Sequence, residues 1–145
     1  MKSNRRPAGF TLVELMVTIV IGAILIAVAG PTYMTQIRKS RRTEAKTAIL
    51  DLASREERLY TTTNAYSANP LTLGYPAFGQ AIGGGYYKLD VVAPAGANPA
   101  TFTVTATAIN SQLKDTACAQ FIVNQTGKQS SLNSAGADST AQCLN

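Results

Sequence analysis

The stretch GFTLVELMVTIVIGAILIAVAGP, residues 9–31, is the longest apolar run in the 145-residue chain and decides its fold. No charged residue occurs from Leu15 to Gly30, although the chain carries 13 basic and 8 acidic residues. A helix over Phe10–Ala29 would rise about 30 Å, the thickness of the hydrocarbon core of a bilayer. The run therefore predicts a membrane anchor, a cleaved secretory signal peptide or a buried core helix. Apolarity alone does not decide between them, because Ala27-Val28-Ala29 has the small-x-small pattern that signal peptidase prefers.

Glu14 is the one charged residue inside this run. A carboxylate at the bilayer centre costs roughly 2.5–3.5 kcal/mol on insertion scales, so such a residue usually has a partner. Cleavage after Gly9 would make Phe10 the N-terminus, with its ammonium group one helical turn from Glu14. Within one chain this pairing is poor, because the amine points along the helix axis. In a neighbouring copy displaced by about one turn, roughly 5 Å, the ammonium would lie level with Glu14 and set the stagger.

These residues carry a resemblance to a known family. The segment Gly9–Met16, preceded by a short basic leader and followed by an apolar helix, resembles the class III signal of type IV pilins. The resemblance implies that a prepilin peptidase cleaves after Gly9 and N-methylates Phe10, and that Glu14 is the assembly glutamate. It also implies that the helix stays in the protein, first as a membrane anchor and then as part of a filament core.

A second helical pattern follows the apolar run. Apolar residues at helical spacing predict one buried stripe, made of Ala45, Ala48, Ile49, Leu52 and Leu59. Since no strong breaker lies between Pro31 and the polar cluster at residues 61–64, we expect one helix from Phe10 to Tyr60, about 75 Å long. Pro31 lacks an amide proton, and with Gly30 before it we expect a kink or local unwinding there.

A basic cluster lies beyond the apolar run and consists of Arg38, Lys39, Arg41, Arg42 and Lys46. The leader carries only Lys2, Arg5 and Arg6, so the flanking charges conflict with the positive-inside rule for a cytoplasmic leader. The pilin resemblance nevertheless requires that orientation. The cluster predicts contacts with acidic neighbours in a filament, DNA binding or a solvated helix face, and we favour the solvated face.

From Asn64 onward the sequence is rich in Pro, Gly, Asn, Ser and Thr and has no helical period. Strands are predicted over Tyr86–Val92, Thr101–Ala108, Cys118–Asn124 and Gln129–Leu132. Gly83-Gly84-Gly85 predicts a turn and lacks the pattern of a nucleotide-binding loop. The expected class is α+β, the pilin fold: one long helix, kinked near Pro31, packed on a small antiparallel sheet. The expected divisions are a leader (1–9), a hydrophobic helix (10–30), an amphipathic helix half (31–62) and a globular head (63–145).

Cys118 and Cys143 are the two cysteines of the chain. An even count in an exported chain favours one disulfide over two buried free thiols. The bond would close a loop of about 25 residues, worth roughly 3 kcal/mol in the chain-entropy model. Pilins that resemble this chain commonly staple their C-terminal region in this way.

The composition argues against an enzyme. Histidine is absent, which removes the commonest general base and a common zinc ligand. Ser111-Gln112-Leu113-Lys114 has the Ser-x-x-Lys spacing of some acyl-transfer enzymes, but it lacks their companion motifs and the domain is too small for that fold. We expect no catalytic residue, no metal and no cofactor.

The prediction is a structural subunit of a bacterial type IV pilus, supporting pilus biogenesis, twitching motility, adhesion or DNA uptake. A finer resemblance, in Arg41–Tyr66, Gly84–Tyr87 and Cys118–Gly127, is to minor pilins of the PilE type. It implies other pilin subunits, a prepilin peptidase, an inner-membrane platform and an assembly ATPase as partners, with DNA less favoured. The chain is expected to span the inner membrane once, N-terminus cytoplasmic, and then to join an extracellular filament. Alternatives are a binding module with a signal peptide and a type II secretion pseudopilin, although Asp115 and Asp138 are too few for the calcium site of major pseudopilins.

Overall fold

The computed structural model describes residues 9–97 and 100–144. The elements are α1 (Leu12–Thr63), β1 (Ala81–Ile82), β2 (Tyr87–Val92), β3 (Thr103–Ala108), the 3-10 helix η1 (Asn110–Lys114), β4 (Gln120–Asn124), β5 (Gln129–Leu132) and α2 (Thr140–Cys143). The chain divides into two compact units, Met1–Ile37 and Arg38–Asn145. The leader residues Lys2, Arg5 and Arg6 lie outside the described residues.

The first unit contains α1 up to Ile37. Its large apolar side chains from Phe10 to Met34 are 47–79% exposed. In the described part of the chain, α1 holds one stretch long and apolar enough to cross a membrane, by length and composition only. The helix assignment runs without a break through Gly30 and Pro31, so the kink stays a prediction.

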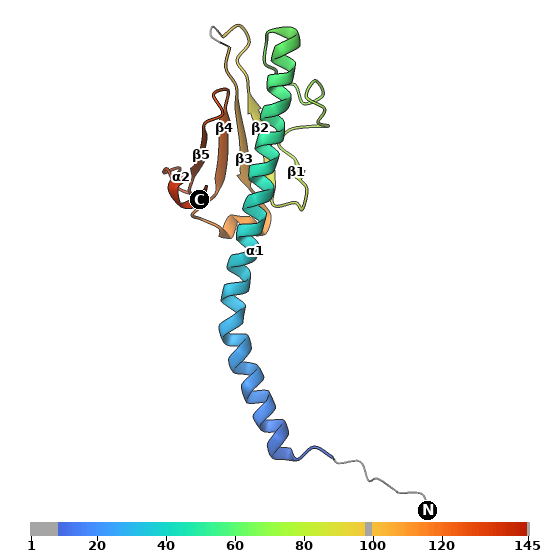
Figure 1. Ribbon diagram of the computed structural model, residues 1–145, viewed down its shortest axis with the longest axis vertical. Coiled ribbons are helices and arrows are strands. Elements are labelled where there is room, and N and C mark those ends of the chain that lie inside the picture. The colour runs from blue at the N-terminus through green and yellow to red at the C-terminus, as the bar shows by residue number, and fades with distance from the viewer. Residues whose placement is uncertain (1–8, 98–99, 145) are drawn as a thin grey trace, which may run out of the picture. The chain divides into compact units, whose positions relative to one another are not determined.

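The second unit packs the remainder of α1 against one face of a five-stranded sheet (Figure 1). The sheet is antiparallel throughout, in the order β1-β2-β3-β4-β5, because each strand turns back beside its predecessor. Alternation places one side of every long strand in the core, as in the cross-strand row Leu89, Ala106 and Phe121. Ala45, Ile49 and Leu52 from α1 meet this face and are completely buried. The fold is therefore the predicted one, a long helix on a small antiparallel sheet.

The predicted elements are confirmed with small shifts at their ends. The helix ends at Thr63, and Asn64 closes it in a left-handed conformation (φ 55°) that Asn tolerates better than most residues. Its amide donates to the carbonyl of Tyr60 at 2.8 Å. The fourth predicted strand, Gln129–Leu132, is observed with those bounds, whereas β2, β3 and β4 each begin one or two residues later than predicted.

Three short elements were not predicted: β1, η1 and α2. Each is five residues or fewer, which is too short for a period of 2 or 3.6 to show in the sequence. The predicted turn at Gly83–Gly85 joins β1 to β2. Glu44 of α1 holds it by accepting a 2.7 Å hydrogen bond from the amide of Gly84.

Candidate functional site

The first candidate site is the start of α1, where Gly9, Phe10 and Glu14 lie exposed. Thr11 precedes the helix and its Oγ1 accepts a hydrogen bond from the amide of Glu14 at 3.3 Å. Thr11 thereby caps the start of α1 through its hydroxyl, a contact that was not predicted. In the described part of the chain no basic side chain forms an ion pair with Glu14. Apolar residues stand directly before and after it in the helix, at Val13 and Leu15.

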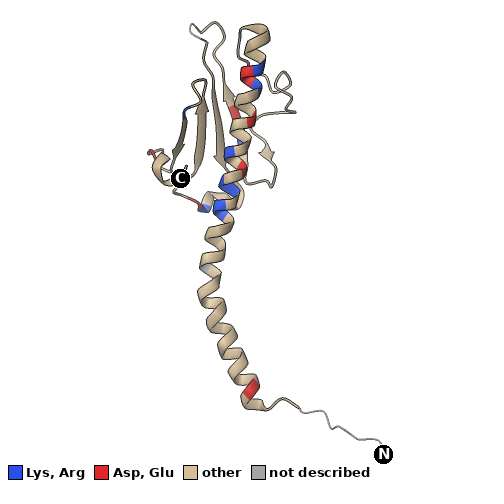
Figure 2. Cartoon of the chain, in the orientation of Figure 1, with Lys and Arg blue, Asp and Glu red and all other residues tan. Residues whose placement is uncertain are grey.

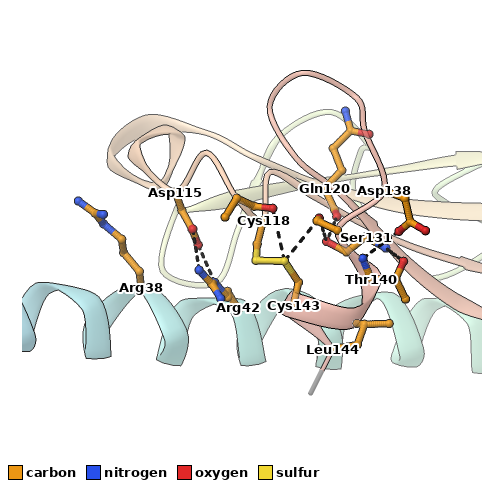
Figure 3. Close-up of a disulfide and its surroundings, with 12 residues drawn as sticks. Arg38, Arg42, Asp115, Cys118, Gln120, Ser131, Asp138, Thr140, Cys143 and Leu144 are labelled. Atoms are coloured by element: carbon orange, nitrogen blue, oxygen red, sulfur yellow. Dashed lines mark hydrogen bonds and ion pairs between the residues drawn. A yellow bond between two sulfur atoms is a disulfide. The ribbon is translucent and has the colours of Figure 1, made fainter.

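The second candidate site is the basic cluster, which the structure splits into two groups with different surroundings. Arg42 is held in a two-pronged contact with Asp115, Nε to Oδ2 and Nη2 to Oδ1, both at 2.7 Å (Figure 3). The side chains are only 17% and 4% exposed. The hydrogen bond to Asp115 raises the pKa of Arg42, so the pairing stabilises the protonated guanidinium. Lys46 donates to the carbonyl of Leu144 at 3.4 Å. The interpretation as a solvated helix face is wrong for Arg42, because its side chain is largely buried and paired with Asp115. No pattern in the sequence predicts this pair, since the two residues are 73 positions apart and meet only on folding.

The second group keeps its cations without carboxylate partners. We call Arg38, Lys39, Arg41 and Lys114 the basic collar; in the described part of the chain none of the four forms an ion pair. Arg41 lies over the ring of Tyr86, 3.6 Å from its centroid, and donates to Ser111 Oγ at 3.1 Å. Figure 2 shows basic segments gathered where η1 meets α1. In Figure 3 the side chain of Arg38 extends away from the Arg42–Asp115 pair.

Gln112 fixes η1 against the helix and thereby brings Lys114 to the collar. It is completely buried, and its Nε2 donates to Asp115 Oδ2 at 2.9 Å and to the carbonyl of Arg38 at 3.4 Å. Lys114 was not predicted to join the basic cluster, since no spacing in the sequence links it to Arg38. Ser111, the first residue of the Ser-x-x-Lys pattern, accepts from Arg41, so its hydroxyl belongs to the collar.

The Cys118–Cys143 disulfide is present, as the cysteine count predicted, with a Cα–Cα distance of 5.8 Å. Both cysteines are buried, and the bond holds α2 against the segment before β4 (Figure 3). Ser131 of β5 supports the same corner, because its Oγ donates to the carbonyl of Gln120 at 2.8 Å. The tail after β5 is thereby tied to the sheet.

A buried carboxylate at the other end of the second unit was not predicted. Glu56 on α1 is completely buried; Oε2 accepts from the amide of Ser67 at 3.1 Å, and Oε1 has no hydrogen-bond partner among the residues that the structure describes. Burial raises the pKa of Glu56 above its ordinary value. Glu56 thus anchors the loop that leaves α1, at the cost of a desolvated charge.

Comparison with known proteins agrees with these features. The family model described as "Type IV minor pilin ComP, DNA uptake sequence receptor" matches residues 31–122, and one for the prokaryotic N-terminal methylation motif matches residues 4–30. The type IV major pilin PilA of Myxococcus xanthus (strain DK1622) is 33% identical over 72 residues, 50% of this chain and 33% of that protein. The chain therefore matches only a third of that relative's length. A solved type IV pilin from Shewanella oneidensis shares 21% identity, with a TM-score of 0.47 over 63% of this chain and 89% of that one.

Proposed function

The chain belongs to the family of the type IV minor pilin ComP, and we propose that it is cleaved after Gly9, N-methylated at Phe10 and aligned in the filament by Glu14. As a pilin, it assembles with other pilin subunits into a pilus. A type II secretion pseudopilin is not favoured, because the family model and the curated relative are both type IV pilins.

One observation carries the proposal: the apolar side chains from Phe10 to Met34 are exposed, and in its described residues the chain supplies nothing to cover them. Such a surface needs a bilayer or the helices of other subunits. A free carboxylate at its start needs a cation, and cleavage after Gly9 would create one at Phe10 of the next subunit. The exposed helix, Glu14 and Gly9 would then all contribute to filament assembly.

The remaining partners follow from this route. A prepilin peptidase would act on the cytoplasmic side, and an inner-membrane platform with an assembly ATPase would extract the helix from the bilayer. The precursor would span the inner membrane once, with its N-terminus in the cytoplasm.

Mass spectrometry of the mature protein tests the processing step. We expect a first residue Phe10 carrying one additional methyl group. A chain that starts at Gly30 would instead establish a cleaved secretory signal and end the pilin processing proposal. A chain that still starts at Met1 in purified filaments would do the same.

Substitution of Glu14 tests the assembly step. Glu14→Ala and Glu14→Gln are expected to leave membrane insertion and cleavage intact and to reduce the amount of subunit in sheared filaments by at least tenfold, because the buried ammonium of the neighbour loses its partner. Thr18→Ala, one turn further along the exposed helix, is the control and should be incorporated normally. Normal incorporation of Glu14→Gln would count against charge-set stagger.

A second function, DNA uptake, is favoured by the basic collar. The matched family is described as a DNA uptake sequence receptor, and its model covers the whole collar. Four cations that have no carboxylate partner among the described residues, one of them stacked on a tyrosine, suit the phosphates of a duplex. Each neutralised phosphate contributes about −0.9 to the slope of log K against log salt concentration, so the collar predicts a slope of roughly −3 to −4.

Two matched triple variants test the DNA proposal. The collar variant is Arg38→Gln/Lys39→Gln/Lys114→Gln; the control variant is Arg58→Gln/Lys88→Gln/Lys128→Gln and removes the same charge elsewhere. Duplex binding by the mature chain in neutral detergent is measured against salt, and transformation frequency in cells. We expect the collar variant to lose most of the slope and the control variant to keep it. Equal slopes would refute the collar as the DNA surface. Competition between host and unrelated DNA fragments then measures specificity.

A further inference from the structure

The basic collar follows directly on the apolar part of the chain. The first unit ends at Ile37, 25 residues after α1 begins at Leu12, which is about 38 Å of helical rise. A bilayer with both headgroup layers is about 40–45 Å thick. If Phe10 lies at one surface, Arg38, the next residue after Ile37, reaches the headgroups of the opposite surface.

Tyr33 marks the same depth independently. The residue is 66% exposed, and it stands five positions before Arg38. Tyrosine concentrates at the boundary between hydrocarbon and water, where an apolar ring and a polar hydroxyl are both accommodated. A bilayer surface between Tyr33 and Arg38 satisfies both residues.

The charges of the collar fit the chemistry of that surface. Arg42, a few residues along the same helix, is neutralised by Asp115 of its own chain, whereas Arg38, Lys39 and Lys114 have no carboxylate partner in the described part of the chain. Clusters of four or more Lys and Arg beside a membrane helix bind anionic lipids, with each cation contributing about fivefold in affinity near a negatively charged surface. Topology rules disfavour cations on this side of the membrane, and an anionic ligand there would offset their charge.

We propose that, before assembly, the basic collar binds the phosphate groups of anionic phospholipids at the outer surface of the inner membrane. This inference rests on the proposed membrane stage of the subunit. Lipid binding holds the second unit at the bilayer surface. The collar becomes free to bind DNA phosphates only after the subunit has been extracted from the membrane. The lipid is favoured over DNA at this stage, because the anchored helix keeps the collar within reach of headgroups at all times.

The test uses the whole mature chain in nanodiscs made of equal parts of phosphatidylglycerol and phosphatidylcholine. Native mass spectrometry after release gives the ratio of the two lipids retained on the protein. We expect the wild type and the control variant Arg58→Gln/Lys88→Gln/Lys128→Gln to retain phosphatidylglycerol preferentially, at least tenfold more than the collar variant Arg38→Gln/Lys39→Gln/Lys114→Gln. Arg41 is left in place because it packs on Tyr86, and an intact disulfide with wild-type circular dichroism verifies folding.

Three results would overturn the inference. The wild type could show no preference for phosphatidylglycerol, or both variants could lose it equally, which would mean attraction by net charge alone. Alternatively, the collar variant could lose duplex binding in neutral detergent while its lipid ratio matches that of the wild type, which would make the collar a DNA surface only. Failure of DNA binding in the wild type, with the lipid preference intact, would instead remove the DNA proposal and leave this one standing.

Discussion

The two halves of α1 both carry apolar side chains, but the structure buries those of one half and leaves those of the other exposed. From Arg38 to Thr63 the core-facing apolar residues form one stripe against the sheet of the same chain. Ala45, Ile49 and Leu52 are completely buried there, and Ala48 and Leu59 are partly buried. From Leu12 to Met34 large apolar residues occur on all sides and remain exposed. A stripe can be satisfied by one neighbour, whereas a helix that is apolar all round needs surroundings on every side. A single buried stripe is typical of a helix in a folded domain. A helix that is apolar on all sides is typical of one surrounded by lipids or other helices.

The sharpest way to break this comparison is the same substitution in each half. Ile49→Ala removes a completely buried side chain and is expected to lower the free energy of unfolding by about 4 kcal/mol, within the range for buried Ile to Ala changes. Ile24→Ala, at a side chain that is 59% exposed, is expected to leave it unchanged. Urea unfolding of the mature chain in mild detergent, followed by near-ultraviolet circular dichroism, measures both. Equal losses would mean that the first half is also packed within its own chain.

The disulfide tests how the second unit retains its C-terminal tail. Cys143→Ser, or Cys118→Ser with Cys143→Ser, is expected to cost about 3 kcal/mol, since the bond closes a loop of 25 positions. Limited proteolysis should cut first after β5, in the tail around α2. Reduction of the wild type with a mild thiol gives the matched measurement without a mutation. A tail that stays protected after reduction would show that the hydrogen bonds of Ser131 are sufficient to hold it.

Local patterns in the sequence predicted most of this fold. The spacing of Ala45, Ile49 and Leu52 identified the buried stripe, and the alternation of Val104 and Ala106 with threonines identified β3, because each pattern lies within one element. The N-terminal motif and the cysteine pair indicated the family and the disulfide.

What could not be predicted depends on contacts between distant segments. Nothing in the sequence indicates that Arg42 pairs with Asp115, since a charged residue on a helix is ordinarily solvated. Glu56 continues the spacing of the buried stripe after Leu52, and that signal was available. Its charge argued for the surface, and only the packing of the loop at Ser67 explains its burial.

The Arg42–Asp115 pair sharpens the comparison within the second half of α1. Asp115→Asn leaves the guanidinium of Arg42 without a counter-charge in a largely buried position, and we expect a loss of about 2–3 kcal/mol. Asp51→Asn is the control, because the Asp51–Arg55 pair is 45–50% exposed and such pairs contribute at most about 1 kcal/mol. Both are measured by urea unfolding at low and high salt. A similar, salt-sensitive loss in the two variants would mean that Arg42 is better hydrated than its burial indicates.

The smallest expected effect comes from Glu56, the one charged residue in the buried stripe. Because burial raises the pKa of Glu56 in the folded state, protonation of Glu56 favours folding. This contribution to stability is full below the ordinary carboxyl pKa and is lost as pH rises through the raised value.

Glu56→Gln removes the buried charge while keeping an oxygen for the amide of Ser67, so we expect it to be more stable than the wild type at pH 7 by about 1 kcal/mol. Near pH 4 the advantage should shrink towards zero, since the wild-type carboxyl is then largely neutral. Glu57→Gln, an exposed neighbour, is the control and should show no comparable gain. A Glu56→Gln variant less stable than the wild type at pH 7 would contradict this prediction. It would mean that the hydrogen bond from the amide of Ser67 to a charged carboxylate stabilises the fold by more than burial of the charge costs.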